Sequence, residues 1–165
     1  GKGLRGPQSA GILMGRKDLI EAARLNAPPR GGNIGRGMKV NKEEVFGMYA
    51  ALERYINIDH DREWKIWEDR ISLIENSAKK VNGITTTISV PPIANHTPTL
   101  NIAWDMNKIK VTRDEFQQKL RNGNPSIEVV AGKDNSINIT VFMLEPRQER
   151  IVATRIYEEL MKASA

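Results

Sequence analysis

Residues 1–18 read GKGLRGPQSAGILMGRKD and place one lysine, Lys2, between two glycines. Glycine lacks a Cβ atom, so Gly3 and Gly6 can adopt positive φ angles and let the backbone approach a ligand closely. Gln8 can both donate and accept hydrogen bonds. The pattern is compatible with a reactive lysine on a tight turn. A solvated lysine in a glycine-rich loop explains the same residues without any function.

An apolar run and a helical segment follow this turn. Residues 12–14 are apolar and predict a short buried strand. Residues 17–25 predict a helix, and the prolines at the end of residues 26–29 end it, because a residue before proline leaves the helical region. The side chains expected to point inward from this helix are Leu19, Ile20, Ala22 and Ala23.

Residues 30–37 contain four glycines and two arginines. Backbone amides and guanidinium groups in such a loop can bind phosphate or carboxylate. The loop lacks the spacing of a P-loop, so it is not a nucleotide-binding motif. On the residues alone we favour a flexible connector with solvated arginines. Arg30 and Arg36 as anion contacts are the alternative.

The order of residues in two blocks resembles that of the selenocysteine synthase-like family. Residues 1–20 resemble the segment that carries the family's cofactor lysine, and residues 35–42, GRGMKVNK, resemble its arginine-rich loop leading into a helix. These are pyridoxal-phosphate enzymes of fold type I, the large aspartate-aminotransferase fold. They include seryl-tRNA selenium transferases and ammonia lyases that act on phosphorylated amino-sugar acids. The C-terminal half resembles the family only in its pattern.

The resemblance implies a role for each residue that matches the motif. Lys2 would carry pyridoxal phosphate as a Schiff base, beside Gly3, Gly6 and Gln8, and an anionic substrate would contact Arg5, Arg30 and Arg36. The implied reaction is β-elimination with deamination of an amino acid or a phosphorylated amino-sugar acid. An aminotransferase or a seryl-tRNA selenium transferase is the alternative, and a non-catalytic basic binding domain is the second alternative. No metal site is predicted.

One strand departs from the family's pattern. Members with an amino-acid substrate tend to carry an arginine in the strand that matches residues 126–130, because a planar guanidinium suits a carboxylate. The matching position here is Val129, beside Glu128. This difference argues against carboxylate recognition from that strand and against a true seryl-tRNA selenium transferase. It favours Arg30 and Arg36 as the anion contacts.

Hydrophobic periodicity predicts two helices after residue 40. Asn41 and Glu44 form a capping box that opens the first, and His60 is interpreted as a helix cap rather than a metal ligand. The apolar face of the first helix comprises Val45, Met48, Tyr49, Leu52, Tyr55 and Ile56. That of the second, over residues 62–80, comprises Trp64, Trp67, Ile71, Ile74, Ala78 and Val81.

From residue 83 the period changes to two, which predicts strands over residues 84–90, 99–104, 126–131 and 137–142. Leu100, Ile102 and Trp104 share one face of the second strand. A capping box at Thr112 and Glu115 opens a helix, and Pro146 starts the last helix, with Val152, Ile156, Leu160 and Ala163 inward. This order predicts an antiparallel sheet with helices packed on one face.

Together with the resemblance, the expected fold class is α/β, a fold type I pyridoxal-phosphate-dependent transferase. Residues 1–56 would end the large cofactor-binding domain, residues 57–82 would form a long connecting helix, and residues 83–165 would form a small α+β domain. In fold type I enzymes most cofactor ligands precede the lysine. We therefore expect the chain to be the C-terminal part of a longer enzyme and to be inactive alone.

Composition narrows the class of protein. Apolar residues make up 39% and charged residues 27%, which is typical of globular domains. The chain has no cysteine, which excludes disulfides and a cysteine nucleophile and suits a reducing cytoplasm. The net charge is +5, but the signs are mixed beyond the N-terminal third, so nucleic acid is not the expected partner. No apolar run reaches the ~18 residues of a membrane span. The resemblance implies a cytoplasmic homo-oligomer.

Overall fold

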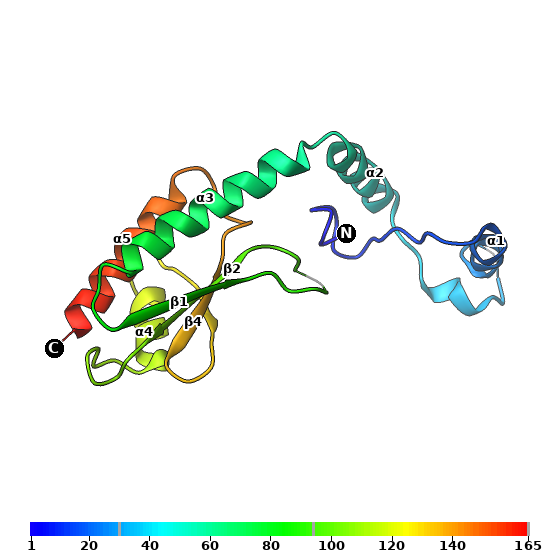
Figure 1. Ribbon diagram of the computed structural model, residues 1–165. Coiled ribbons are helices and arrows are strands. Elements are labelled where there is room, and N and C mark those ends of the chain that lie inside the picture. The colour runs from blue at the N-terminus through cyan, green and yellow to red at the C-terminus, as the bar shows by residue number, and fades with distance from the viewer. Residues whose placement is uncertain (30, 94, 165) are drawn as a thin grey trace. The chain divides into compact units, whose positions relative to one another are not determined.

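The computed structural model describes residues 1–29, 31–93 and 95–164, and the chain divides into two compact units, Gly1–Asp59 and His60–Ala165. The first unit contains α1 (Lys17–Asn26), the 3-10 helix η1 (Ile34–Gly37) and α2 (Lys42–Ile56). The second contains α3 (His60–Ala78), β1 (Ile84–Ser89), β2 (Thr99–Trp104), α4 (Arg113–Arg121), β3 (Val130–Ala131), β4 (Ser136–Thr140) and α5 (Gln148–Ala163) (Figure 1).

The sheet of the second unit is antiparallel and has the strand order β1-β2-β4-β3. Ile102 of β2 lies opposite Thr86 of β1 and opposite Ile137 of β4. Side chains alternate between the two faces of a strand, and in β2 those of Leu100, Ile102 and Trp104 are buried. The predicted antiparallel sheet and the inward face of its second strand are confirmed.

The helices of this unit share one core with the sheet. The predicted inward residues of the last helix, Val152, Ile156, Leu160 and Ala163, are all buried. Four of the six predicted for the long helix are buried as well, namely Ile71, Ile74, Ala78 and Val81, while Trp67 packs against them partly exposed. Because α3 supplies part of this core, it folds as an element of the second unit.

Arg70 of α3 is a cation held inside the second unit. Its Nη1 donates to the carbonyl oxygen of Leu144 at 2.7 Å and to that of Val141 at 3.3 Å. Its Nε lies 3.7 Å from Oε2 of Glu149 in α5, and the two side chains are 13% and 16% exposed. Arg70 therefore joins α3 to the turn after β4 and to the start of α5.

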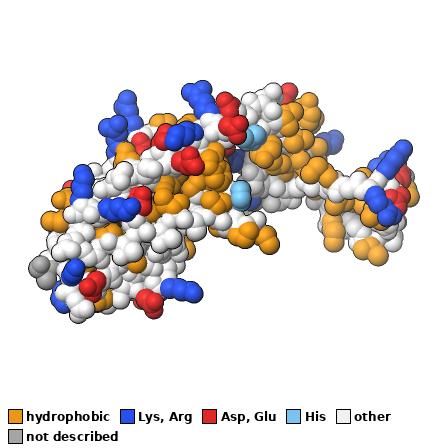
Figure 2. Space-filling view, in the orientation of Figure 1, with side chains coloured by type: hydrophobic (Ala, Val, Ile, Leu, Met, Phe, Trp, Pro, Cys, Tyr) orange, Lys and Arg blue, Asp and Glu red, His pale blue; other side chains and the backbone are white. Residues whose placement is uncertain are grey.

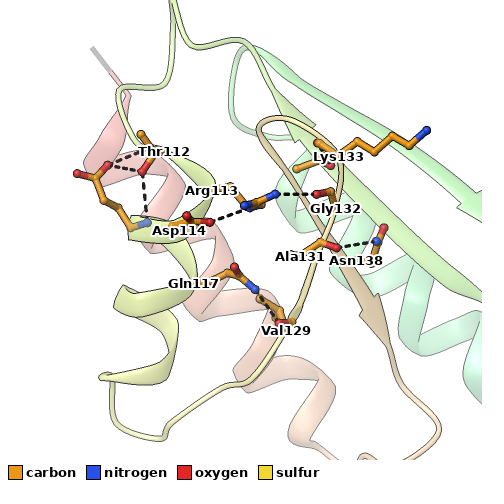
Figure 3. A network of polar contacts seen from close by, with 11 residues as sticks. Thr112, Arg113, Asp114, Gln117, Val129, Ala131, Gly132, Lys133 and Asn138 are labelled. Atoms are coloured by element: carbon orange, nitrogen blue, oxygen red, sulfur yellow. Dashed lines mark hydrogen bonds and ion pairs between the residues drawn. The ribbon is translucent and has the colours of Figure 1, made fainter.

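Side chains of α4 bind the segment that leads into the β3–β4 hairpin (Figure 3). Arg113 Nη1 donates to the carbonyl oxygen of Gly132 at 3.1 Å, and its Nε donates to Asp114 at 2.8 Å. Gln117 Nε2 donates to the carbonyl oxygen of Val129 at 2.9 Å. These bonds satisfy carbonyl groups that no neighbouring strand reaches.

Both predicted capping boxes are confirmed. The Asn41 amide donates to Oε2 of Glu44 at 3.1 Å before α2. The Thr112 amide donates to Oε2 of Glu115 at 2.9 Å, and the Glu115 amide donates to Oγ1 of Thr112 at 3.3 Å. Each box satisfies amides that have no partner within the helix.

The strand predicted over residues 126–131 is shorter than expected. Strand pairing is limited to Val130–Ala131. The Ile127 amide donates to the carbonyl oxygen of Leu120 at 3.0 Å, and Val129 accepts from Gln117. The backbone before Val130 is therefore bound to α4 instead of β4, which corrects the prediction.

The first unit departs further from its predicted packing. Residues 12–14 form no strand, and Leu13 and Met14 are 70% and 82% exposed. No side chain of α1 is buried. Of the predicted face of α2 only Met48 is buried, together with Ala51. These three predictions are wrong because, within the described part of this unit, no layer covers the apolar faces.

Uncovered apolar side chains of the first unit lie over α1 and over α2, where Figure 2 shows them in orange. The exposed apolar residues are Leu13, Met14, Leu19, Ile34, Met38, Val45, Phe46, Tyr49, Tyr55 and Ile56. Among the described helices, none combines the length and apolar character needed to cross a bilayer.

Replacing Arg70 tests how much the second unit depends on its buried cation. Arg70→Ala leaves the partly buried Glu149 carboxylate without its charge partner and removes two hydrogen bonds to carbonyls. We expect the free energy of unfolding to fall by about 1.5–3 kcal/mol, the range for hydrogen bonds of a charged group. Arg121→Ala is the matched control, because Arg121 and Glu128 form an ion pair with side chains 52% and 65% exposed, and its cost should be about 0–1 kcal/mol. Equal shifts in urea-unfolding midpoints would contradict this assignment.

Candidate functional site

Lys2 lies on a closed turn at the start of the first unit. The Gly6 amide donates to the carbonyl oxygen of Gly1 at 2.9 Å, and the Arg5 amide donates to that of Lys2 at 3.1 Å. The left-handed conformation in this turn belongs to Arg5, with φ of 57°, and to neither Gly3 nor Gly6. The predicted tight turn is present, but its glycines serve another purpose.

Small residues let the turn pack directly on α2. A Cβ atom added to Gly6 would lie 3.0 Å from Cβ of Ala51, and one added to Gly47 would lie 2.8 Å from Cγ of Pro7. At these separations a larger side chain would displace the turn. The glycine content of the segment thus permits close contact between a loop and a helix.

A carboxylate of α2 holds the same segment. The Ser9 hydroxyl donates to Oε1 of Glu44, while the other oxygen of this carboxylate caps the Asn41 amide. The hydrogen bond from Ser9, followed by that from Asn41, lowers the pKa of Glu44 below its usual range. Glu44 is therefore an ionised anchor between the N-terminal segment and the start of α2.

The Lys2 side chain is exposed on this anchored turn. Among the residues that the structure describes, its ammonium group has no hydrogen-bond or ion-pair partner. Gly3 and Gln8 are exposed on the same segment, and Gly6 is half-buried against α2. The structure thus brings together Lys2 and the three residues predicted beside the cofactor. A lysine amine without a carboxylate partner is available for reaction with a carbonyl group.

Arg36 packs in a different part of the first unit. It lies in η1, and the segment is held to the end of α1 by Asn33, whose Nδ2 donates to the carbonyl oxygen of Leu25 at 2.6 Å. A Cβ atom on Gly35 would lie 2.4 Å from the carbonyl oxygen of Asn26. Arg36 is exposed, and in the described residues no hydrogen bond or ion pair joins it to the Lys2 turn. Arg30 lies outside the described residues.

The position matched to the family's carboxylate-binding arginine lies in the second unit. Val129 lines a mainly apolar crevice of about 270 Å³, together with Ile127, Ile139 and Val152. The neighbouring Glu128 accepts from Arg121 of α4, with Nε and Oε1 2.5 Å apart, and this hydrogen bond lowers the pKa of Glu128. The guanidinium beside this segment therefore comes from a helix and is already paired.

Sequence reasoning missed the role of α4 because it searched the strand for an arginine. Arg113 and Arg121 are 16 and 8 residues away from Val129 in sequence, yet they contact the segment around it. The sequence did contain one signal for this contact. Arg121 ends a predicted helix, and the acidic Glu128 follows in the next extended segment.

Basic residues of the first unit are partly neutralised nearby. Arg16 Nη2 lies 2.6 Å from Oδ2 of Asp18, and Arg24 Nη2 lies 2.8 Å from Oε1 of Glu21. The basic character of residues 1–42 in the sequence is therefore not a uniform surface of free cations.

No family model and no curated protein matches the sequence. Among solved structures, the structure of D-glucosaminate-6-phosphate ammonia-lyase matches with a TM-score of 0.60 at 16% sequence identity. The match covers 91% of this chain and 39% of that chain. The chain shares the fold of part of an ammonia-lyase. It spans well under half of that protein's length, and at this identity the likeness concerns the fold.

A larger residue at Gly6 should release the Lys2 turn from α2. Gly6→Leu forces a side chain toward Ala51 and Met48, and overpacking costs about 1–3 kcal/mol. We expect the Arg5 amide and the residue 6 amide to exchange with deuterium about tenfold faster or more. Gly3→Leu is the control, because nothing lies within 4 Å of its added Cβ. Exchange that increases equally in both variants would argue against packing of the turn on α2.

Proposed function

We propose that this chain carries the cofactor lysine of a pyridoxal-phosphate-dependent lyase of fold type I, related to the selenocysteine synthase-like family. Lys2 is the attachment residue, and Gly3, Gly6 and Gln8 lie beside the cofactor. The observation that carries the proposal is the exposed Lys2 amine on a turn fixed to α2. The fold likeness to an ammonia-lyase over 91% of the chain supports it.

The described residues fit the cofactor in their chemistry. An aldehyde needs an accessible amine, and the Lys2 ammonium group has no carboxylate partner in the part of the chain that the structure describes. The exposed Gly3 leaves space beside that amine, since nothing lies within 4 Å of its added Cβ. Gln8 supplies both a donor and an acceptor on the same segment.

Lys2 would also act as a general base in the reaction. When bound, pyridoxal phosphate would supply an electron sink for the substrate carbon that carries the amine. Nζ of Lys2 takes the proton from that carbon. The leaving group departs from the adjacent carbon with its bonding electron pair, and hydrolysis then gives ammonia and a keto acid. The Ser9–Glu44 contact holds the backbone of the segment that carries Lys2 on α2.

The substrate we favour is a phosphorylated amino-sugar acid. D-glucosaminate 6-phosphate appears in the name of the structural neighbour, and the missing arginine at Val129 disfavours an ordinary amino acid. Arg36, which is exposed and contacts no carboxylate among the described residues, would bind the substrate's anionic group together with Arg5 and Arg30. We further propose that the active enzyme is a homo-oligomer.

Borohydride trapping tests the attachment residue. The intact protein is incubated with pyridoxal phosphate, reduced, digested and examined by mass spectrometry. We expect the phosphopyridoxyl mass on the peptide that contains Lys2, and its loss together with lyase activity in Lys2→Ala. Lys17→Ala, which changes an exposed lysine in the same unit, should keep both. Labelling spread over several lysines, or unchanged in Lys2→Ala, would refute the assignment.

Two substrates separate the role of Arg36 from a structural role. Charge-assisted hydrogen bonds are worth about 1.5–3 kcal/mol, so Arg36→Ala should raise KM for D-glucosaminate 6-phosphate about tenfold or more. For unphosphorylated D-glucosaminate the effect on KM should be small. Lys39→Ala, an exposed cation three residues away, is the control. An equal loss with both substrates would remove Arg36 from phosphate binding.

A further inference from the structure

A groove of about 420 Å³ lies between α3 and α5 in the second unit. Within this lining, the Ser77 hydroxyl of α3 donates to the backbone carbonyl oxygen of Ala153 in α5 at 3.2 Å. Both residues are small, which lets the two helices approach closely at this contact. The groove has the size of ligand pockets, roughly 300–1,000 Å³.

Polar side chains line this groove from both helices. Asn76 and Lys80 come from α3 and the turn after it, and Arg150 and Thr154 come from α5. Each pair is spaced by four residues, which places both members on one side of its segment. Two cations and two neutral hydrogen-bond donors therefore face one space.

The two cations of the groove, Lys80 and Arg150, make no contact with a carboxylate in the described residues, whereas most of the unit's other arginines do. The arginines that contact a carboxylate are Arg70, Arg113, Arg121 and Arg155. In the described residues, neither Lys80 nor Arg150 makes such a contact. Each can therefore bind an anion without first breaking an ion pair.

The acidic residues beside these cations in sequence are directed elsewhere. Glu149, which precedes Arg150, lies against Arg70. Glu75 lies 2.7 Å from Nζ of Lys79 and accepts from the Thr86 hydroxyl at 2.7 Å. At the end of α3, the carbonyl oxygen of Ser77 accepts from the Lys80 amide at 3.3 Å, and that of Ala78 accepts from the Val81 amide at 3.0 Å. Glu149 and Glu75 are therefore engaged by other cations than Arg150 and Lys80.

We propose that the groove between α3 and α5 binds a phosphate group. Arg150 and Lys80 hold its charge, and Asn76 and Thr154 donate to its oxygens. A phosphate monoester carries about −1.5 to −2 charge at pH 7 and offers three acceptor oxygens, which suits two cations and two neutral donors better than the two oxygens of a carboxylate. The site uses no residue of the Lys2 turn, so it is independent of the proposed lyase function.

Lysine footprinting of the intact protein tests this site. An amine-reactive acetylating reagent labels exposed lysines, and mass spectrometry follows Lys80 and the exposed Lys110 during titration with sodium phosphate at constant ionic strength. We expect saturable protection of Lys80 with little change at Lys110. Arg150→Gln should raise the phosphate concentration for half-protection about tenfold or more. Arg147→Gln, the same charge change at an exposed residue that does not line the groove, should leave it unchanged.

Additional ligands identify the source of the phosphate, and a Lys2 variant distinguishes this proposal from the proposed lyase function. Protection by a sugar phosphate assigns the groove to a free metabolite, and protection by phosphoinositide vesicles alone assigns it to a lipid headgroup; both outcomes support a phosphate site. Lys2→Ala should retain protection of Lys80, even if the lyase proposal fails. Equal protection of Lys80 and Lys110, or equal effects of Arg150→Gln and Arg147→Gln, would overturn the proposal.

Discussion

The architecture of the second unit depends on Arg70. Shielding a cation from water is costly unless it gains partners, and Arg70 gains two carbonyl acceptors for Nη1 and the nearby charge of Glu149. These partners belong to the turn after β4 and to α5, so the side chain links both of them to its own helix, α3. The apolar contacts of these helices are less directional. Arg70 thus specifies which arrangement of the helices the hydrophobic core adopts.

The consequence extends to the groove between α3 and α5. By engaging Glu149, Arg70 removes the carboxylate next to Arg150 from competition for its guanidinium. The contact of Ser77 with Ala153 then keeps the two helices close. One partly buried ion pair therefore links the two helices of the groove and keeps Glu149 away from Arg150.

The packing of the first unit depends on a different constraint. Glycines without side chains stand where the Lys2 segment meets α2. In its described part, only Ala10, Met48 and Ala51 are buried hydrophobic residues. Gly6 and Gly47 permit the Lys2 segment to rest on α2, and Ser9 bonds to Glu44. This contact orders the lysine locally, while the apolar surfaces of α1 and α2 stay exposed. Local order at Lys2 thus does not require a large core within this unit.

Local signals in the sequence were sufficient to predict much of the secondary structure of the second unit. The alternation of Leu100, Ile102 and Trp104 predicted β2, and the Thr112–Glu115 pair predicted the start of α4, because both features depend on residues a few positions apart. The segment 126–129 has the same alternating appearance, yet its backbone bonds to Leu120 and Gln117. Helix α4 and strand β4 compete for the backbone hydrogen bonds of this segment. This is a tertiary effect, and hydrophobic periodicity cannot predict it.

The same limitation affected the predicted site in both units. The face of α2 has a correct helical period, but a period identifies the apolar side without identifying what covers it, and so Tyr49 and Ile56 were expected inside. Lys2, Gly3, Gly6 and Gln8 lie on one segment because they are neighbours in sequence, and their role beside a cofactor stays a prediction. Arg36 is not joined to them by any contact among the described residues, because its loop packs on α1 through Asn33.

Anion recognition by this chain is governed by which cations already have carboxylate partners. Arg121 lies near Val129 in the folded unit, but its guanidinium is bound to Glu128. It would have to lose that ion pair before it could bind a substrate. Arg113 is similarly engaged by Asp114 and by the carbonyl of Gly132. Cations without such partners bind an anion at a lower cost, because no existing contact is exchanged. The crevice beside Val129 is therefore better suited to apolar contacts. The cations left without a carboxylate among the described residues include Arg36, Lys80 and Arg150, and this is why the two proposals place anion binding on them.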